Sequence, residues 1–343
     1  MEYEVPKIRI ENGAFKKIPT HVGKYSTKFT IITDGHIKKL GNDLLSAMRK
    51  FGLSCNLIIL PPGEHTKSIS FAEKIATHLV HLGNKRDSCL IALGGGVIGD
   101  LTGFMASIFM RGINYVSVPT TMLAMCDSCI GGKTGVDLPE GKNLLGTFYN
   151  PKEVIIDPLL VTSLPDKQIK IGMAEVIKHA VLADAQFFKF LNRNTTAILS
   201  KKPTVLKQTI AKSVQIKLSI VKKDGREMLQ NTQKDVSRML LNYGHTVGHA
   251  LEKLSKFELS HGEAIAIGMV AENRIAVGKK LLKEVDAVKI ESLIKKFGLP
   301  TKMPSQYSPA QLKTAMGMDK KHIDGKLFFA LPLGIGKAKI MHV

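Results

Sequence analysis

Residues 89–105 read CLIALGGGVIGDLTGFM, and this stretch decides the fold class of the first part of the chain. The apolar run at its start predicts a buried strand, the three glycines predict a turn, and the apolar residues that follow predict a helix. Gly94, Gly96 and Gly99 satisfy the pattern G-x-G-x-x-G, in which glycines let backbone N–H groups approach a pyrophosphate at a helix N-terminus. The stretch therefore predicts a strand–turn–helix unit that suits a dinucleotide.

Two features distinguish this loop from an ordinary Rossmann motif. It follows the third predicted strand rather than the first, and Pro119-Thr120-Thr121 stands about twenty positions on, where an acidic residue is expected. An acidic residue is available earlier, at Asp34, after an upstream predicted strand. A tight turn without a ligand is the alternative interpretation of the glycines.

Residues 1–155 alternate short β-branched runs with amphipathic stretches. The predicted strands are 29–33, 55–60, 89–93 and 115–118, and helices are predicted over 37–51 and 70–82. This alternation predicts an α/β domain with a mainly parallel, Rossmann-like sheet. Ligands of such sheets bind at the carboxyl ends of the strands, where the Gly, Pro and Thr clusters stand.

Residues 156–343 have a different pattern. Amphipathic helices are predicted over 173–191, 205–221, 245–253, 263–282 and 285–297, and only 327–331 reads as a strand. We therefore expect an α/β domain over 1–155, whose glycine loop suits a dinucleotide, and a mostly α-helical domain over 156–343.

The chain is strongly basic, with 49 Lys and Arg against 29 Asp and Glu among 343 residues, a formal net charge of +20. The basic residues are interleaved with apolar ones at helical spacing, which is typical of solvated helix faces rather than of a nucleic-acid-binding tail. No apolar run reaches the roughly 18 residues of a membrane span, the N-terminus lacks the features of a secretory signal, and four Cys do not suggest a disulfide scaffold. We expect a cytoplasmic protein whose partner is an anionic small molecule, not nucleic acid or a membrane.

Metal-ligand side chains recur in the second half of the chain. Glu175 and Lys178 lie on one face of a predicted helix, His245 and His249 are one helical turn apart, and His261 begins a further predicted helix. Two histidines and one carboxylate form a site with open positions, the pattern of catalytic rather than structural zinc. Helix-capping and core histidines are the alternative.

Two glycine-rich segments, at 131–135 and 141–143, alternate flexible backbone with Lys133 and Lys142. They do not match the Walker A pattern, because Asp127 stands where its first glycine is required. A phosphate cradle of another kind is favoured, and surface lysines are the alternative.

Together these motifs resemble the 3-dehydroquinate synthase family of sugar-phosphate cyclases. The matching strings, in family order, are PGEHTK (62–67), GGGVIGD (94–100), PTTMLA (119–124), DSCIGGKTG (127–135), GKN (141–143), MAEVIK (173–178), LNYGHTVGHA (241–250) and HGEA (261–264). The resemblance extends from about residue 30 to residue 335.

The resemblance implies a phosphate lyase of the shikimate pathway of aromatic amino acid biosynthesis. It would convert 3-deoxy-D-arabino-heptulosonate 7-phosphate to 3-dehydroquinate and phosphate by transient oxidation with NAD, phosphate elimination, re-reduction and intramolecular aldol closure. It also implies a zinc or cobalt ion and a homodimer.

The family's functional residues carry over by position, and the resemblance implies an NAD-binding domain over 1–155 and a metal- and substrate-binding domain over 156–343. The implied metal ligands are Glu175, His245 and His261. The implied NAD contacts are Asp34, Glu64, Lys67, Gly95, Gly96, Val97, Asp100, Thr120, Thr121, Asp127, Lys133 and Lys142. The implied catalytic and substrate-binding residues are Arg111, Lys133, Asn143, Lys178, Lys217, Arg238, Asn242, His249 and Lys320.

Two places depart from the family pattern. Asp224-Gly-Arg-Glu227 replaces the usual Asp-Glu-x-Glu and begins a longer loop, and Asp137-Leu-Pro-Glu140 replaces the usual Asn-His-Pro. Another sugar-phosphate cyclase is the nearest alternative function, but Lys217, Arg238 and Asn242 are candidate partners for a substrate carboxylate, which favours dehydroquinate synthase. A metal-dependent polyol dehydrogenase is a more distant alternative.

Overall fold

The computed structural model divides the chain into two compact units, residues 4–164 and 165–343. The structure describes residues 5–225, 237–317, 322–323 and 326–342. Within those residues, no helix has the length and apolar character needed to cross a membrane. The assignment of NAD binding to the first part of the chain, and of metal and substrate binding to the second, stays a prediction.

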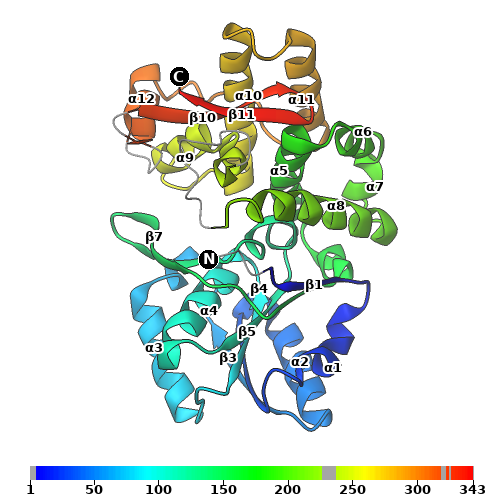
Figure 1. The fold of residues 1–343 in the computed structure, drawn as a ribbon, viewed down its shortest axis with the longest axis vertical. Helices are drawn as coiled ribbons and strands as arrows, with labels where there is room; N and C mark the ends of the chain where they lie inside the picture. Colours follow the sequence, from blue (N-terminus) through cyan, green and yellow to red (C-terminus); the bar gives the residue numbers. More distant parts are fainter. Residues whose placement is uncertain (1–4, 226–236, 318–321, 324–325, 343) are drawn as a thin grey trace. The chain divides into compact units, whose positions relative to one another are not determined.

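A parallel sheet lies at the centre of the first unit (Figure 1). Its described strands have the order β1-β8-β5-β4-β2-β3, and each neighbouring pair is parallel. The strands are β1 (Lys7–Ile10), β2 (Lys28–Asp34), β3 (Ser54–Leu60), β4 (Cys89–Gly94), β5 (Asn114–Pro119) and β8 (Glu153–Ile156). The predicted α/β class with a Rossmann-like sheet is confirmed.

Helices cover both faces of this sheet (Figure 1). On one face, α1 (Ile18–Val22) and α2 (Lys38–Lys50) contribute to a core cluster with buried residues of β2 and β4. On the other, α3 (Ile69–His81) and α4 (Gly96–Ile108) contribute to a second cluster. Because both faces are covered, β4 is buried along its whole length, which explains its uninterrupted apolar sequence.

The glycine loop lies at the carboxyl edge of the sheet. Gly94 ends β4 and pairs with Pro119 at the end of β5, and the N–H of Thr120 donates to the carbonyl of Gly94 at 2.9 Å. The helix α4 begins two residues after Gly94. The topology therefore places Thr120 beside Gly94, although the two residues are 26 positions apart in the sequence.

The glycine-rich segments form an antiparallel hairpin of β6 (Lys133–Leu138) and β7 (Gly141–Phe148). Glycine is required where the two strands approach most closely. A Cβ atom at Gly135 would lie 2.7 Å from the carbonyl oxygen of Leu145, a distance that real Cβ atoms do not show. Sequence reasoning interpreted these glycines as flexible backbone around an anion and did not predict the strands.

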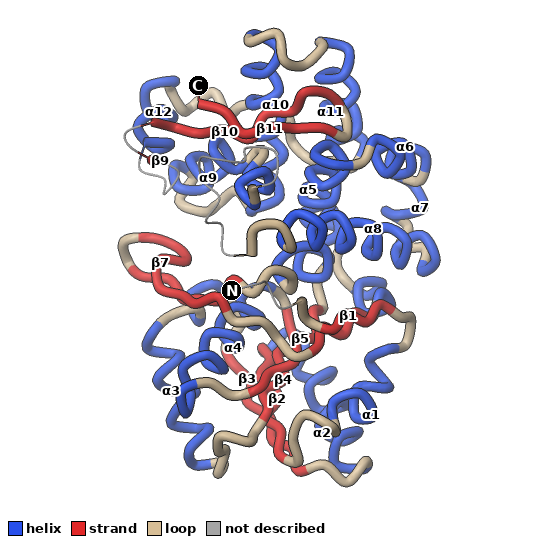
Figure 2. The backbone as a smooth tube through the Cα atoms, viewed as in Figure 1, coloured by secondary structure: helices blue, strands red, loops and turns tan. Residues whose placement is uncertain are grey.

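Helices dominate the second unit, shown in blue in Figure 2. They are α5 (Asp166–Ala183), α6 (Ala185–Arg193), α7 (Thr195–Leu199), α8 (Pro203–Val221), α9 (His245–Leu254), α10 (His261–Gly278), α11 (Glu284–Lys296) and α12 (Pro309–Gly317). An antiparallel sheet has the order β11-β10-β9, with β9 at His322–Ile323, β10 at Lys326–Gly334 and β11 at Lys337–His342. The prediction of a mostly helical second part is confirmed, although only β10 was predicted among these strands.

The single helix predicted over 173–191 is wrong in one respect, because two helices occupy it. Asp184 separates α5 from α6 with extended backbone (φ −153°), and its carboxylate accepts hydrogen bonds from the N–H groups of Gln186 and Phe187, both at 2.9 Å. An aspartate at this position caps the second helix. The apolar periodicity continues across the break, so periodicity alone does not reveal it.

Candidate functional site

Three metal-ligand side chains converge in the second unit. Glu175 lies within α5, His245 is the first residue of α9, and His261 is the first residue of α10. The Oε1 atom of Glu175 is 3.4 Å from Nε2 of His245 and 3.2 Å from Nε2 of His261. One potential ligand atom of each residue lies within 4.8 Å of the others.

This arrangement fits a divalent metal ion. Zinc binds nitrogen and oxygen ligands at about 2.0–2.1 Å in a tetrahedron, so neighbouring ligand atoms should be about 3.3 Å apart. The measured separations of 3.2 and 3.4 Å are close to that value. Imidazole and carboxylate are also donors that zinc and cobalt accept.

Both histidines direct Nε2 toward Glu175 and Nδ1 toward an acceptor. The Nδ1 atom of His245 lies 3.2 Å from the carbonyl oxygen of Tyr243, and that of His261 lies 3.4 Å from both carboxylate oxygens of Glu252. Burial lowers the pKa of His261, but hydrogen bonds to Glu175 and Glu252 outweigh it and raise this pKa to about 10. Without a metal, His261 is therefore a cation held between two carboxylates.

Local structure fixes the start of α10. Ser260 and Glu263 form a capping box, in which the Glu263 carboxylate accepts a hydrogen bond from the Ser260 N–H at 3.0 Å. His261 is the residue between the N-cap and the first full turn, so the cap determines where its side chain leaves the helix.

The start of α9 is held by a buried carboxylate of α10. Glu272 accepts hydrogen bonds from the N–H groups of Gly244 at 2.7 Å and Val247 at 3.3 Å, on either side of His245. These N–H groups lie at a helix N-terminus, which a carboxylate stabilises. The two helices that carry the histidines are thus connected directly.

Buried cations also gather in this unit. Lys178 on α5, Lys217 on α8 and Arg238 on η7 (Arg238–Asn242) are at most 5% exposed, and these three elements pack against one another. Lys178 forms an ion pair with Glu175, and the guanidinium of Arg238 donates to the carbonyl of Gly225 at 2.8 Å. Buried cations are costly unless anions or hydrogen bonds compensate them, so this cluster suits an anionic ligand.

The remaining predicted residues of this unit lie close to the same elements. Asn242 is the last residue of η7, and the ring of His249 is 5.2 Å from that of His245. The His249 side chain is 42% exposed, far more than His245 at 11%, so it is the accessible member of the pair. Lys320 lies outside the described residues, as do residues 226–236 of the loop that the sequence indicates is longer than usual.

The predicted anion site of the first unit is the N-terminus of α4. Gly95 is its N-cap, Gly96 and Val97 begin the helix, no side chain caps it and no acidic residue occupies its first turn. A Cβ at Gly95 would lie 3.3 Å from the methyl group of Thr121, so glycine keeps this approach open. Exposed backbone amides without a competing carboxylate fit a pyrophosphate.

Five further predicted residues meet beside this helix. The ammonium of Lys67, which is 4% exposed, donates to Oδ2 of Asp100 at 2.6 Å and to Oδ1 of Asn143 at 2.5 Å. Burial lowers the pKa of Lys67, but the charge of Asp100, the hydrogen bond to it, and the charges of Glu64 and Asp137 together outweigh burial and raise this pKa. Lys142 forms an ion pair with Glu64 at 3.5 Å. These contacts fasten the β6–β7 hairpin beside α4.

The other predicted NAD contacts of the first unit lie in different places. Asp100 and Lys133 line one small cavity together with Gly99, Ser128 and Gly132. Asp127 lies nearby in sequence, in the π-helical turn η5 (Ala124–Ser128). Asp34 ends β2, and its carboxylate accepts from the N–H of His36 at 2.8 Å.

Arg111 is separated from the glycine loop within the first unit. It lies after the carboxyl end of α4, whose 13 residues span about 20 Å. Its side chain is exposed and its backbone is left-handed (φ 70°). The structure therefore does not bring Arg111 together with the other anion-binding residues of this unit.

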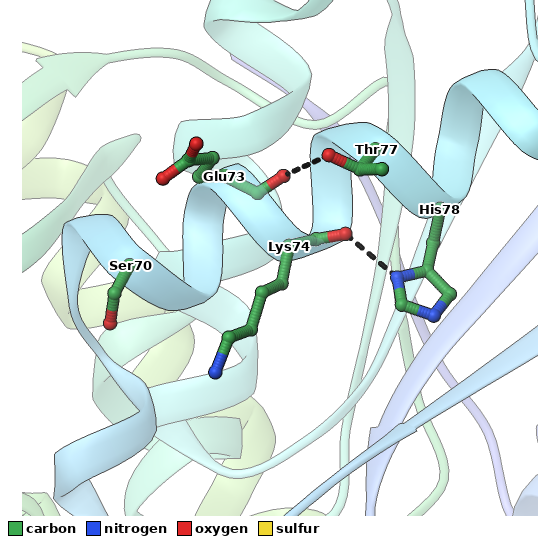
Figure 3. A pocket seen from close by; sticks show the side chains of 5 residues that line it. All are labelled: Ser70, Glu73, Lys74, Thr77 and His78. Atoms are coloured by element: carbon green, nitrogen blue, oxygen red, sulfur yellow. Dashed lines mark hydrogen bonds between the residues drawn. The ribbon is translucent and has the colours of Figure 1, made fainter.

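A separate hollow of about 340 Å³ lies on the surface of α3, lined by Ser70, Glu73, Lys74, Thr77 and His78 (Figure 3). The hydroxyl of Thr77 donates to the carbonyl of Glu73 at 3.1 Å, and the His78 ring bonds to the carbonyl of Lys74 at 2.8 Å. These side chains are occupied by their own helix, and none was predicted to be functional. This hollow is a solvated helix face.

Sequence reasoning missed two carboxylates of the second unit, Glu252 and Glu272. Glu252 follows His245 by seven residues, two turns of one helix, so helical spacing could have placed it on the same face. Glu272 had no such signal, because its role depends on the crossing of α9 and α10.

Comparisons with known proteins agree with this geometry. The family profile for the 3-dehydroquinate synthase N-terminal domain matches residues 57–171, and that for the C-terminal domain matches residues 172–322. A 3-dehydroquinate synthase of Thermodesulfovibrio yellowstonii is 44% identical over 339 residues, which cover 97% of this chain and 92% of that protein.

Two solved structures have the same fold along the chain. A 2-epi-5-epi-valiolone synthase from Streptomyces hygroscopicus subsp. jinggangensis 5008, with NAD+ and Zn2+ bound, gives a TM-score of 0.91 at 26% identity, covering 100% of this chain and 94% of that one. A 2-deoxy-scyllo-inosose synthase, in complex with carbaglucose-6-phosphate, NAD+ and Co2+, gives 0.89 at 25% identity, covering 100% and 96%. The sequence matches are more specific than these structural ones: this chain belongs to the 3-dehydroquinate synthase family.

Proposed function

We propose that this chain is a carbon–oxygen lyase that converts 3-deoxy-D-arabino-heptulosonate 7-phosphate to 3-dehydroquinate and phosphate, with NAD and a divalent zinc or cobalt ion. The observation that carries the proposal is the approach of His245 and His261 to one oxygen of Glu175, at 3.4 and 3.2 Å, in a chain of this family. When bound, NAD accepts and returns a hydride, and the metal polarises hydroxyl groups of the substrate.

The chain's own residues supply binding and orientation. The first-turn amides of α4, with Gly95 and Gly96, bind the pyrophosphate of NAD, and Thr120 and Thr121 border it. Lys67, Asp100 and the hairpin residues Lys142 and Asn143 form a connected network next to this site. A connected network orients its members before the ligand arrives, which supports its assignment to NAD and substrate binding.

The buried cations of the second unit bind the anionic groups of the substrate. Lys178, Lys217 and Arg238 neutralise negative charge, and Asn242 adds an amide donor. His249 exchanges a proton with the substrate or with the departing phosphate, since it is near His245 yet largely accessible.

The alternative function is that of a different sugar-phosphate cyclase, because two similar solved structures are synthases of other products. The substrates of those synthases lack a carboxylate. The burial of both Lys217 and Arg238 supports the carboxylate-bearing heptulosonate instead.

Phosphate release tests the proposal. Purified protein with zinc and NAD should release phosphate from 3-deoxy-D-arabino-heptulosonate 7-phosphate, whereas sedoheptulose 7-phosphate should not react. Omission of NAD, addition of a chelator, or the substitution Glu175→Ala should abolish release. Preference for sedoheptulose 7-phosphate would establish the alternative cyclase, and stoichiometric accumulation of NADH would establish a dehydrogenase.

We further infer a homodimer located in the cytoplasm. Support for the dimer comes from the exposed apolar side chains of β7, namely Leu144, Leu145 and Phe148, which are 40–45% accessible in the single chain. Apolar side chains that gather on one exposed element often mark a protein contact.

A further inference from the structure

We propose that Glu252 is a positioning residue, which holds the His261 imidazole in the tautomer and orientation that bind the metal. This inference rests on the proposed function, because it requires a metal at Glu175, His245 and His261. It adds to that function a residue of α9 that does not itself bind the ion.

The contact between Glu252 and His261 determines which ring nitrogen is available. Glu252 is 8% exposed, and both of its carboxylate oxygens lie 3.4 Å from Nδ1 of His261. A carboxylate accepts hydrogen bonds, so Nδ1 carries the hydrogen and shares it between the two oxygens. When a metal ion replaces the proton on Nε2, the lone pair is on that atom, which faces Oε1 of Glu175 at 3.2 Å.

His245 provides an internal comparison. Its Nδ1 lies 3.2 Å from the carbonyl oxygen of Tyr243, which can only accept, so its Nε2 also keeps the lone pair and faces Glu175. Both ligand histidines therefore have the same two-sided arrangement. The acceptor for His245 is a main-chain carbonyl, which a substitution does not remove. The acceptor for His261 is the Glu252 side chain, so a substitution of Glu252 tests its role.

Orientation matters more for His261 than for His245. Both histidines stand at the first residue of their helices, but the His261 side chain is 31% exposed and that of His245 only 11%. The rings of His245 and His249 also contact it, at 5.3 and 6.1 Å between centroids, but the hydrogen bond to Glu252 is the contact from α9 that selects a ring nitrogen. In metal sites of this kind, loss of such an outer partner typically lowers metal affinity 10- to 100-fold.

The same residues permit a different interpretation, a second ion. His249, Glu252 and His261 also have potential ligand atoms within 4.8 Å of one another. An ion there would need Nδ1 of His261 as a ligand while Nε2 bound the first ion, and a neutral imidazole offers only one lone pair. We therefore favour positioning, and the binding stoichiometry distinguishes the two.

Metal titration of the full-length chain tests the proposal. Metal-depleted wild type, Glu252→Ala and Glu252→Gln would be titrated with Zn2+ in competition with a chromophoric chelator. We expect about 100-fold weaker binding for Glu252→Ala and about tenfold for Glu252→Gln, whose amide oxygen still accepts the hydrogen bond but carries no charge. Glu258→Gln, the same charge change on the exposed loop before α10, should bind like wild type.

A second readout separates positioning from a general structural role. At saturating Zn2+, Glu252→Gln should regain the wild-type kcat, with an unchanged KM for the sugar phosphate, and the metal-free variant should keep the circular dichroism spectrum of folded wild type. The visible absorption of the Co2+ form should shift relative to wild type, because the His261 ring is less restrained.

The outcomes are distinct. Wild-type affinity in a folded Glu252→Ala protein would overturn the proposal, and if that variant does not fold, wild-type affinity in Glu252→Gln would do so. Two ions bound by wild type and one by Glu252→Gln would establish the second site instead. Absence of metal binding by wild type would contradict the proposed function itself, a result that the Glu252 variants cannot produce.

Discussion

The His261 imidazole lies between the carboxylates of Glu175 and Glu252, and its charge state links metal binding to folding. Hydrogen bonds to both carboxylates raise its pKa from 6.5 to about 10 despite burial. A group whose pKa is raised on folding contributes stability fully below its unfolded pKa. That contribution disappears as pH rises through the folded pKa.

Metal-free protein should therefore show a specific pH dependence. We expect the melting temperature of wild type to exceed that of His261→Ala most at pH 6, and the difference to shrink between pH 7 and pH 10.5, estimated from the two pKa values. Thermal denaturation of both proteins in chelator measures it, and subtraction removes the titration of other groups. A difference that stayed constant or grew with pH would contradict the assigned pairing.

Residue spacing indicated a possible site of two histidines and one carboxylate, and the family resemblance implied its ligands, but neither indicated its surroundings. Glu175, His245 and His261 stand in the strings MAEVIK, LNYGHTVGHA and HGEA, which are recognisable in the sequence. Glu252 and Glu272 are ordinary helical glutamates in sequence. Their roles arise from contacts with a second helix, which a one-dimensional pattern does not contain.

At the scale of elements, the crossing of α9 and α10 brings the two histidines together. Glycine makes the close approach possible, since a Cβ at Gly268 would collide with the carbonyl oxygen of Gly244 and lie 2.9 Å from the N–H of Gly248. Both contacts are with main chain, which cannot rotate away. This crossing is the least tolerant part of the site.

Gly268→Ala should consequently destabilise the fold by about 1–3 kcal/mol, the usual cost of overpacking, and should also weaken metal binding. The matched control is Gly278→Ala, at the end of the same helix, where a Cβ meets nothing within 4 Å. That change should be neutral or stabilising, because alanine is the better helix former. Urea denaturation gives both free energies of unfolding, and equal effects of the two substitutions would contradict the close crossing.

Helices and strands could be predicted where their own sequence determines them. They could not be predicted where pairing with a distant strand determines them. The buried strand β4 and helices α2, α3, α8, α9 and α11 match the predicted periodicities to within a few residues. The short strands β1 and β8 were missed, since four residues carry little pattern. β1 pairs with β8, and β8 pairs in turn with β5, so both depend on partners distant in the sequence. The β6–β7 hairpin was missed because its glycines resemble a loop.

At the scale of the whole molecule, the charge of +20 has two sources. Lys67, Lys178, Lys217 and Arg238 are buried and are candidates for binding anions. Most other described lysines are exposed, on helices and on the turns and loops between elements, and nothing in the structure explains their excess. The composition therefore indicated an anionic ligand but did not identify which lysine and arginine side chains would bind it.

The proposed homodimer also belongs to the scale of the whole molecule. The exposed side chains of Leu144, Leu145 and Phe148 stand on a single strand, β7, and burying them against a second copy would remove apolar surface from water. We expect light scattering to give twice the mass of one chain, and Leu145→Lys to shift the protein toward monomer.

Val288→Lys is the appropriate control for that experiment. It places the same charge on an apolar residue of α11 that is 51% exposed, so a general effect of added charge would appear in both variants. If only Leu145→Lys dissociates the protein, the contact involves the hairpin that carries Lys142 and Asn143. Phosphate release should then fall with dissociation, because the hairpin that fastens these residues beside α4 would lose its support. A wild-type monomer with full activity would contradict both the dimer and this coupling.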